Sequence, residues 1–336
     1  MDTMFDTASQ LIDNSRHIVV VQAENPDADS LGSALAIEEI LSNDDRQVNL
    51  FCAIDIPKYL HYIQGWDRVE KDWPKSVDLI ILVDTASETL LTKTFSQPGI
   101  RHHFEVTPIL VIDHHVETEG QQLGFDHSTL IDSSCVATGE LIYKLASSRK
   151  WIINSSAAES LFLAIQSDSL GLTTPNTTAE SYRIAADLVA LGANPSDIEN
   201  RRREYMKKPA DILSYKAKLI EKINYELDGR LATVHITWDE IEEYSDRYNP
   251  GALIIDEMRL VEGVDIAVAI KTYPDGKITG KLRSNIPISQ LVAGYFGGGG
   301  HQYSAGFKIY EDYDTIYREL IDSVTKALDD YDNQAV

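Results

Sequence analysis

The sequence contains few groups that could build a disulfide framework or a thiolate metal site. It has only two cysteines, Cys52 and Cys135, among 336 residues. They lie far apart and match none of the paired spacings that bind zinc. We therefore expect two reduced, buried thiols rather than a disulfide-stabilised secreted protein.

The sequence also lacks a long apolar segment. No run of residues approaches the ~20 that a membrane helix needs. Residues 1–16 are acidic and polar, which is not the pattern of a signal peptide. We therefore expect a cytoplasmic protein that has no membrane partner.

Positive charge is scarce as well. Lysine and arginine number 30 against 53 aspartates and glutamates, which gives a net charge of −23. So acidic a surface repels long duplex nucleic acid, because that binding depends on neutralising many phosphates. A short, highly charged substrate can still bind to so acidic a protein where metal ions and a few basic side chains converge. Part of the acidity can equally be a solvated, solubilising surface.

The first half of the chain alternates short apolar runs with helical stretches. Leu31, Leu35 and Ile37 show the helical spacing within residues 29–41. This alternation predicts an α/β fold with a doubly wound, mostly parallel sheet, whose ligands bind beyond the carboxyl ends of the strands. The expected strands are residues 17–22, 47–52, 77–83 and 108–112.

The remaining chain changes character after about residue 195. Residues 196–226 have a helical pattern that is interrupted or restarted at Pro209, and we interpret them as an inter-domain connector. A hairpin across the turn 273–276 and an amphipathic C-terminal helix follow. The predicted organisation is a domain at 1–195, a helical connector at 196–226 and a smaller α/β substrate-binding domain at 227–336, with a cleft between the two domains.

Acidic and histidine residues gather where the expected strands end. A helix cap or a turn would explain any one of the aspartates singly, Asp27 above all, but the whole set is better explained as a metal site. The residues are Asp27 and Asp29 after the first strand, Asp84 after the third, Asp113, His114 and His115 after the fourth, and Asp168 after a later helix.

Carboxylates crowded at one edge of a sheet would repel each other without cations. Two divalent ions about 3.5–4 Å apart, bridged by one carboxylate, would neutralise that charge. A mixed aspartate and histidine set without thiolates suits Mn²⁺ first, with Mg²⁺ or Co²⁺ as alternatives, rather than structural zinc.

A run of four glycines precedes a histidine near the C-terminus. Successive glycines cost conformational entropy, and they are expected where a ligand needs close backbone approach and free N–H groups. The preceding strand could contribute side chains to the same anion, whereas the alternative is a flexible loop with a surface histidine. The expected substrate-binding residues are Arg283, Ser284, Gly298, Gly299, Gly300 and His301.

The acidic motifs resemble the DHH phosphoesterase superfamily, whose name is the triplet at residues 113–115, and the resemblance covers nearly the whole chain. It implies that Asp84 bridges two ions, that His115 faces the substrate phosphate, and that Asp113 orients the histidines from behind the metal. The implied catalytic residues are His115, Asp84 and Asp113. The implied metal ligands are Asp27, Asp29, Asp84, His114 and Asp168.

The first motif departs from this pattern at one position. Many members of the superfamily read His-x-Asn-Pro-Asp-x-Asp, and the leading histidine binds the first metal. The corresponding residue here is Ala23, which cannot bind a metal. Either Gln22 or water completes the site, or the residue was changed to trap an inactive state. RecJ-type exonucleases also lack this histidine and are active.

The glycine-histidine element is similar to the DHH-associated C-terminal domain, and the two-domain arrangement resembles the nanoRNase and pAp-phosphatase branch. This resemblance implies a Mn²⁺-dependent phosphodiesterase or phosphatase. Its substrates would be short oligoribonucleotides, linear or cyclic dinucleotides, or pAp, cut to mononucleotides by two-metal activation of water, and the protein could be a homodimer. The alternatives are a RecJ-like single-strand exonuclease, a polyphosphate or pyrophosphate hydrolase, and a catalytically weakened nucleotide-binding protein.

Overall fold

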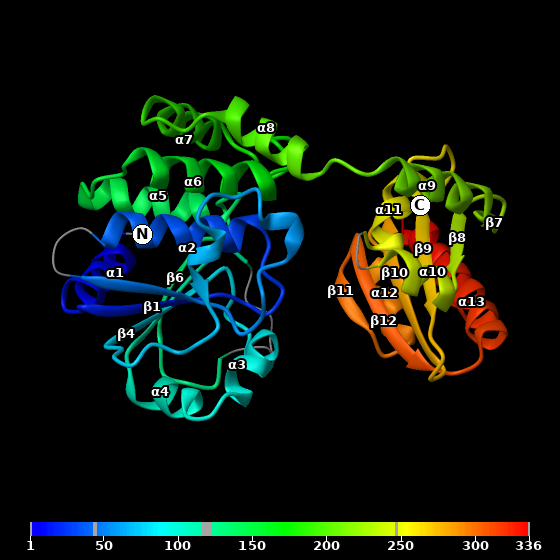
Figure 1. The fold of residues 1–336 in the computed structure, drawn as a ribbon, viewed down its shortest axis with the longest axis horizontal. Coiled ribbons are helices and arrows are strands. Elements are labelled where there is room, and N and C mark those ends of the chain that lie inside the picture. Colours follow the sequence, from blue (N-terminus) through cyan, green and yellow to red (C-terminus); the bar gives the residue numbers. More distant parts are fainter. Residues whose placement is uncertain (1, 43–45, 116–122, 246–247, 335–336) are drawn as a thin grey trace. The chain divides into compact units, whose positions relative to one another are not determined.

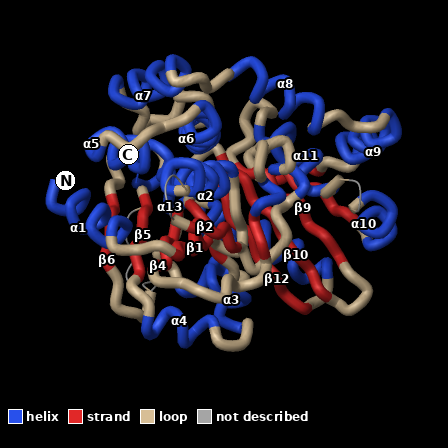
Figure 2. Tube along the Cα trace, turned by 60° about the vertical axis from the view of Figure 1, so that its left-hand side comes forward, coloured by secondary structure: helices blue, strands red, loops and turns tan. Residues whose placement is uncertain are grey.

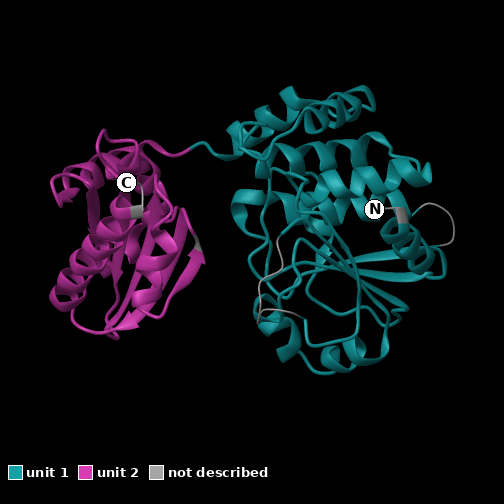
Figure 3. Ribbon diagram, turned by 180° about the vertical axis from the view of Figure 1, so that it is seen from behind, with its two compact units in different colours: residues 1–207 teal, residues 208–336 magenta. Residues whose placement is uncertain are grey.

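The chain forms two compact units, residues 1–207 and 208–336 (Figure 3). The computed structural model describes residues 2–42, 46–115, 123–245 and 248–334. Each unit contains a six-stranded sheet with helices on both of its faces (Figure 1). Within the described residues, no helix has both the length and the apolar character needed to span a bilayer.

The first sheet is parallel throughout, in the order β3-β2-β1-β4-β5-β6. From β1 the chain moves outward to β3 and then returns to place β4 on the other side of β1. Doubly wound sheets bind ligands at such a reversal, here the carboxyl ends of β1 and β4. The predicted fold class is confirmed. The strands are β1 His17–Val21, β2 Gln47–Phe51, β3 Val69–Glu70, β4 Leu79–Val83, β5 Ile109–Asp113 and β6 Ser128–Ile131.

Helices cover both faces of this sheet because its central strands are apolar on both sides (Figures 1 and 2). Ile18 and Val20 of β1 join the core under the first set of helices, while Val19 and Val21 join the opposite core. The first set is α1 Asp2–Asp13, α2 Ala28–Leu41, α5 Thr138–Arg149 and α6 Ser155–Asp168. The second set is α3 Thr92–Ser96 and α4 Ile100–Val106.

Helix α2 packs closely on α6 at Gly32. A Cβ atom at this position would lie 2.6 Å from the backbone oxygen of Ser160 and 3.2 Å from the Cβ of Ala164. Only glycine allows this approach without a shift of one helix. The close packing brings the N-terminus of α2, which follows β1, beside the C-terminal end of α6.

The predicted connector, residues 196–226, is divided between the two units. Helix α8 (Pro195–Tyr205) belongs to the first unit, together with α7 (Ala179–Ala190). Helix α9 (Ala210–Glu221) belongs to the second, and β7 (Asn224–Glu226) already pairs with its sheet. Pro209 separates the helices because it has no N–H to continue α8, and it stands instead as the N-cap of α9.

The second sheet has the order β11-β12-β10-β9-β8-β7, with β8 and β9 parallel and all other pairs antiparallel. Its strands are β8 Leu231–Ile236, β9 Ile266–Thr272, β10 Lys277–Ser284, β11 Gly299–His301 and β12 Ser304–Tyr310. One face packs under α9, α10 (Trp238–Tyr244) and α11 (Pro250–Arg259), and the other under α12 (Ser289–Tyr295) and α13 (Tyr313–Gln334). The predicted hairpin is confirmed as β9 and β10.

Candidate metal centre

Four of the predicted ligands converge at the carboxyl edge of the first sheet. Asp29 stands in the first turn of α2, Asp84 follows β4, His114 follows β5, and Asp168 ends α6. The Nε2 atom of His114 lies 3.7 Å from Asp29 Oδ2, 3.7 Å from Asp84 Oδ1 and 3.3 Å from Asp168 Oδ2. Residues far apart in the sequence thus surround one imidazole nitrogen with three carboxylates.

His114 is held so that this nitrogen faces the carboxylates. Its Nδ1 atom lies 3.3 Å from the backbone oxygen of Cys135, which accepts a hydrogen bond when Nδ1 carries the proton. Nε2 is buried and has no hydrogen-bond partner among the described residues. Burial, followed by the neighbouring His115, lowers the pKa of His114 and favours the neutral ring. A neutral imidazole oriented through Nδ1 is the usual form of a metal-bound histidine.

The carboxylates of this cluster are destabilised as anions while no cation is near them. Burial, followed by the charges of Asp168 and Asp27, raises the pKa of Asp29 to about 8. Burial, followed by the charge of Asp29, also raises the pKa of Asp84 well above its usual value. A divalent cation among these oxygens and His114 Nε2 would remove the repulsion, so the residues fit a metal ion.

Asp84 has an unusual backbone conformation at the end of β4. Its φ angle is 60°, in the left-handed region, and its N–H group donates to the backbone oxygen of Ile112. Aspartate tolerates this region better than most residues, and such conformations gather at functional sites. The turn directs the side chain of Asp84 toward both histidines of the triplet.

Asp113 and His115 form a separate pair beside the cluster. Asp113 Oδ1 lies 2.7 Å from His115 Nδ1 and also accepts from the backbone N–H of His115. The hydrogen bond with Asp113 raises the pKa of His115. Burial alone would raise the pKa of Asp113, but the hydrogen bonds from His115 outweigh burial, so the pKa of Asp113 is lowered. Asp113 therefore orients His115, whereas Cys135 performs this role for His114.

Asp27 occupies a different position from the other predicted ligands. It is the N-cap of α2, and its Oδ1 accepts from the Ser30 N–H at 2.9 Å. The described residues contain two groups whose ligand atoms lie within 4.8 Å of one another, and Asp27 is in neither. Ala23 is buried, and the Nε2 of the adjacent Gln22 has no partner among the described residues. The groups are Asp84, His114 and His115, and Asp29, His114 and Asp168.

Thr138 contacts two of the ligands, although no motif in the sequence pointed to it. Its hydroxyl donates to Asp84 Oδ1 at 3.0 Å, and its backbone N–H donates to Asp29 Oδ2 at 2.7 Å. The next N–H, of Gly139, donates to Asp29 Oδ1 at 3.0 Å. Asp29 thereby caps the N-terminus of α5, where the helix dipole stabilises its charge. Two carboxylates are thus oriented by the start of one helix.

A buried network supports the segment that carries Cys135 and Thr138. Glu140 Oε1 pairs with Lys144 Nζ at 2.7 Å, and its Oε2 accepts from the Ser181 hydroxyl at 2.9 Å. Lys144 also contacts the Cys135 sulfur at 3.1 Å. Burial raises the pKa of Cys135 to about 12, so the sulfur stays a thiol, and both cysteines are free and buried as predicted.

The predicted substrate-binding residues lie in the second unit. Arg283 and Ser284 are consecutive in β10, so their side chains point to opposite faces of the sheet. Arg283 is partly exposed, whereas Ser284 is buried and bonded to Ser289 of α12 at 2.8 Å. His301 lies in β11, and its side chain is outside the described residues.

Packing within the sheet explains two of the glycines in this element. A Cβ on Gly298 would lie 2.2 Å from the backbone oxygen of Gly306, and one on Gly300 would lie 2.6 Å from Ser304. Gly299 between them faces open space, since a Cβ there would meet nothing within 4 Å among the described atoms. Close strand contact therefore requires Gly298 and Gly300, while Gly299 leaves room above the sheet.

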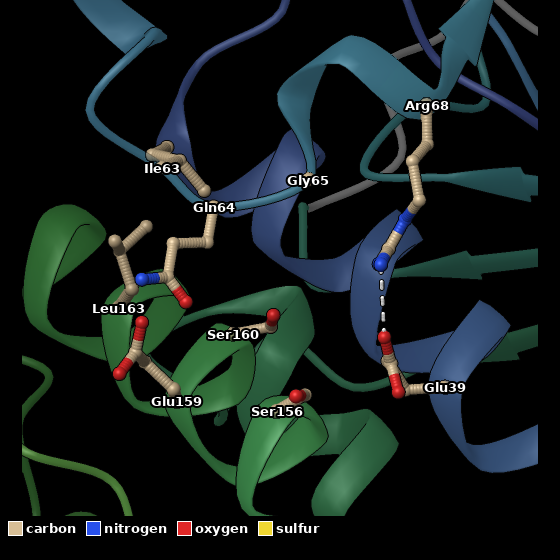
Figure 4. Close-up of a pocket in the computed structure, with 9 residues that line it drawn as sticks. All are labelled: Glu39, Ile63, Gln64, Gly65, Arg68, Ser156, Glu159, Ser160 and Leu163. Carbon is tan, nitrogen blue, oxygen red and sulfur yellow. Dashed lines mark ion pairs between the residues drawn. The ribbon is translucent and has the colours of Figure 1, made fainter.

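A small cavity in the first unit lies apart from the predicted ligands (Figure 4). It has a volume of about 90 Å³ and lies between α2, α6 and the turn around Gly65. Arg68 pairs with Glu39 at 3.0 Å and with Glu38 at 2.8 Å. Because Arg68, the cation that lines the cavity, is already paired with two carboxylates, we assign the cavity a packing role only. Its lining residues are Glu39, Ile63, Gln64, Gly65, Arg68, Ser156, Glu159, Ser160 and Leu163.

Comparison with known proteins finds a family match within the first unit. Residues 17–165 match the DHH family, N-terminal domain. This span contains the triplet and all the predicted ligands except Asp168. Residues 17–165 are therefore similar to the DHH family, and the predicted resemblance is confirmed.

Two curated relatives and one solved structure are similar over nearly the whole chain. The bifunctional oligoribonuclease and PAP phosphatase NrnA of Bacillus subtilis is 24% identical over 90% of this chain and 93% of its own length. The cyclic-di-AMP phosphodiesterase PdeA of Listeria monocytogenes is 24% identical over 96% of this chain and 49% of its own. The solved structure of an exopolyphosphatase-related protein from Bacteroides fragilis has a TM-score of 0.82 at 21% identity. The match covers 98% of this chain and 97% of the Bacteroides chain.

Proposed function

We propose that this protein is a metal-dependent phosphoesterase that hydrolyses short oligoribonucleotides, dinucleotides or pAp to mononucleotides. The observation that carries the proposal is the buried, unpartnered Nε2 of His114 facing the carboxylates of Asp29, Asp84 and Asp168. A structural histidine would have a hydrogen-bond partner at this atom. The phosphoesterase chemistry of the similar relatives is consistent with such a centre.

The residues suggest how the centre is arranged for catalysis. Asp29, Asp84, His114 and Asp168 would hold a divalent ion, Mn²⁺ first, with Mg²⁺ or Co²⁺ as alternatives. When bound, the ion supplies Lewis-acid stabilisation of the phosphoryl oxygens and a nucleophilic water at neutral pH. Thr138 and Cys135 would keep three of the ligands in their orientations, because Thr138 contacts Asp29 and Asp84 and Cys135 contacts His114.

His115 would act on the substrate rather than on a metal. Its Nδ1 is occupied by Asp113 at 2.7 Å, and its side chain is 50% exposed. The raised pKa of His115 keeps the ring protonated to a higher pH than an isolated histidine. A protonated imidazole can donate a hydrogen bond to the phosphoryl group or a proton to the leaving oxygen.

A second ion would be bound through Asp27 and Asp84, with Asp84 shared between the two ions. The structure offers fewer groups for it, because Asp27 caps α2 and Ala23 provides no ligand atom. This observation favours one alternative, a nucleotide-binding protein with weak catalysis. Calorimetry with Mn²⁺ on the unmodified chain and on Ala23→His distinguishes the phosphoesterase from the weak catalyst. A second binding event that appears only in the variant would favour the weak catalyst.

Turnover of a defined substrate panel tests the proposal. The panel contains pApA, pGpG, pAp, cyclic di-AMP and a longer single-stranded RNA, each assayed with Mn²⁺ and with Mg²⁺. We expect the short substrates to be cleaved faster than the longer RNA, since the net charge of −23 opposes binding of many phosphates. Preference for the longer RNA would support the RecJ-like alternative, and binding without turnover would support the nucleotide-binding one.

A further inference from the structure

A second, larger cavity in the first unit is lined by aromatic side chains and contains none of the predicted metal ligands. It has a volume of about 490 Å³, and it lies between the segment 61–67, which connects β2 to β3, and the C-terminal end of α8. A cavity of this volume can hold a ligand of the size of a nucleoside. Its aromatic lining residues are His61, Tyr62, Trp66 and Tyr205.

The rings of this aromatic cavity are fixed before any ligand binds. His61 and Trp66 stack face to face, with ring centres 3.4 Å apart and ring planes 7° apart. The Nε2 atom of His61 lies 2.8 Å from the backbone oxygen of Ile56, which holds the ring in place. The ring of Tyr205 is 6.0 Å from that of His61 at an angle of 60°. Groups already ordered in this way lose little conformational entropy on binding.

These rings are also open to solvent. Tyr205 is 47% exposed, and His61 and Trp66 are partly exposed. Open aromatic faces around a cavity suit a nucleobase, because every base has a π face that can stack on them. The ring chemistry therefore favours a planar aromatic ligand.

The charges around the aromatic cavity do not favour an anion. Arg201 donates to the carboxylate of Glu159 and to the backbone oxygen of Tyr62, so its charge is already paired. Glu204 pairs with Lys207. Asp67 is exposed and has no ion-pair partner among the described residues. The unpaired charge at the cavity is negative, so the ligand should present N–H donors rather than a phosphate.

A carboxylate beside stacked rings distinguishes between the bases. The Watson–Crick edge of guanine has two adjacent donors, N1–H and the N2 amino group, which match the two oxygens of one carboxylate. Adenine and cytosine place an acceptor nitrogen beside their amino group on this edge, and uracil has a single N–H between two carbonyls. Because paired bonds to a charged acceptor are stronger than neutral ones, guanine fits Asp67 best.

The aromatic cavity is separate from the metal centre. Glu159, which pairs with the arginine of the cavity, and Asp168 are nine positions apart on α6, which corresponds to roughly 13 Å along the helix. Tyr59, two residues before the cavity segment, donates to the backbone oxygen of Pro26 at 3.1 Å, next to Asp27 in the chain. The two sites therefore use the same part of the first unit but share no residue.

We propose that the aromatic cavity is an accessory binding site for a guanine base. The base would stack on Tyr205 and the paired rings of His61 and Trp66, and Asp67 would accept its two N–H bonds. In an oligoribonucleotide, this base would belong to a nucleotide other than the one being cleaved. That use rests on the proposed function, whereas guanine binding itself rests on the residues of the first unit alone.

Binding without turnover tests the recognition by Asp67. Calorimetry on the full chain in EDTA compares guanosine and adenosine 5′-monophosphates, which differ only in the base, and we expect the guanosine nucleotide to bind more tightly. Asp67→Asn should weaken its binding about tenfold but not that of the adenosine nucleotide, since an asparagine amide can pair with adenine. The control is Asp72→Asn, which removes an exposed charge outside the cavity and should change neither affinity.

Tyr205→Leu tests the stacking. It should weaken binding of both nucleotides by a similar factor of about tenfold, because stacking does not depend on the base, whereas Tyr205→Phe should retain the affinity. Tyr225→Leu is the matched control, since Tyr225 is 48% exposed and lies in the second unit. Equal affinities for the two nucleotides, or equal effects of a cavity variant and its control, would overturn the site.

Steady-state kinetics with Mn²⁺ then connect the site to the reaction. The ratio of kcat/KM for pGpGpG to that for pApApA should fall about tenfold in Asp67→Asn and remain unchanged in Asp72→Asn. If neither trinucleotide is hydrolysed but binding of the guanosine nucleotide still depends on Asp67, the proposed function fails and the site stands. If both are hydrolysed and the ratio does not change in Asp67→Asn, the role of the site in substrate binding is overturned.

Discussion

At the scale of single residues, Asp84 combines a left-handed backbone with a buried charge. Its φ of 60° suits asparagine as well as aspartate, so Asp84→Asn keeps the turn and removes only the charge. We expect turnover to fall by at least about 10³, equivalent to ~4 kcal/mol in the barrier, together with weaker Mn²⁺ binding. Kinetics and calorimetry measure the two effects.

The exposed Asp126 provides a control for this substitution. Asp126→Asn also removes one negative charge from the first unit and should leave both turnover and Mn²⁺ binding unchanged. Turnover of Asp84→Asn within about tenfold of the natural chain, a difference of only ~1.4 kcal/mol, would contradict the assignment of Asp84 as a metal ligand.

Thr138 is the clearest positioning residue of the centre. Thr138→Val removes the hydroxyl that donates to Asp84 at 3.0 Å but keeps the backbone bond to Asp29. We expect Mn²⁺ affinity to fall about tenfold, as for other groups that orient metal ligands, with little change in KM. Thr138→Ser should restore the affinity because it keeps the hydroxyl group.

A valine substitution elsewhere tests whether the effect belongs to the metal centre. The Thr325 hydroxyl donates to the backbone oxygen of Ile321 within α13, far along the chain from the ligands. Thr325→Val should leave Mn²⁺ binding unchanged. If Thr138→Ser binds Mn²⁺ as weakly as Thr138→Val, the hydroxyl does not position Asp84.

At the scale of elements, the contact between α2 and α6 determines where Asp29 and Asp168 meet. A Cβ at Gly32 would lie 2.6 Å from the Ser160 backbone oxygen, so Gly32→Ala forces the helices apart. We expect a loss of about 1–3 kcal/mol in the free energy of unfolding, because backbone cannot yield as a side-chain tip can. Denaturant unfolding measures this loss.

Gly294→Ala is the matched control for this substitution. Gly294 is also within a helix, α12, and a Cβ there would meet nothing within 4 Å among the described atoms. This variant should be unchanged or more stable by up to about 1 kcal/mol, since alanine is the better helix former. A Gly32→Ala chain as stable as the natural one would show that the helices can move apart at little cost.

At the scale of the whole molecule, the acidic centre makes stability depend on pH and metal. Burial raises the pKa of Asp29 to about 8, burial raises that of Asp84, and the bond with Asp113 raises that of His115. Each group holds its proton more tightly when folded, so its stabilisation is complete below its unfolded pKa and is lost as the pH rises through its folded pKa.

We therefore expect the metal-free chain to lose stability as the pH rises from about 5 to about 8. Saturating Mn²⁺ should reverse this trend, because ionised carboxylates bind it, and an excess of about 100 times Kd adds ~2.7 kcal/mol. Denaturant unfolding in EDTA and in Mn²⁺ at several pH values measures both trends. Asp29→Asn should flatten the slope in EDTA, and an unchanged slope in that variant would contradict the role given to Asp29.

The sequence by itself determined the fold of the first unit and most of the candidate centre. The central strands β1, β4 and β5 are nearly continuous apolar runs, and β2 alternates apolar residues with Gln47 and Asn49; local pattern reveals both. The short strands β3 and β6, at the sheet edges, contain polar residues and were not expected. The predicted ligands were found because their chemistry is unusual at strand ends, where a parallel sheet gathers side chains from distant segments.

Only the tertiary structure decided which of these groups touch and which other residues support them. Thr138 bonds to Asp29 across 109 positions of the chain, and no local pattern reports such a contact. The second sheet separates Arg283 from Ser284 because consecutive strand residues face opposite sides. It also gathers Lys271 and Lys281 through the pairing of β9 with β10. Composition and spacing show which chemistry a chain contains, whereas strand register and helix contacts determine which side chains act together.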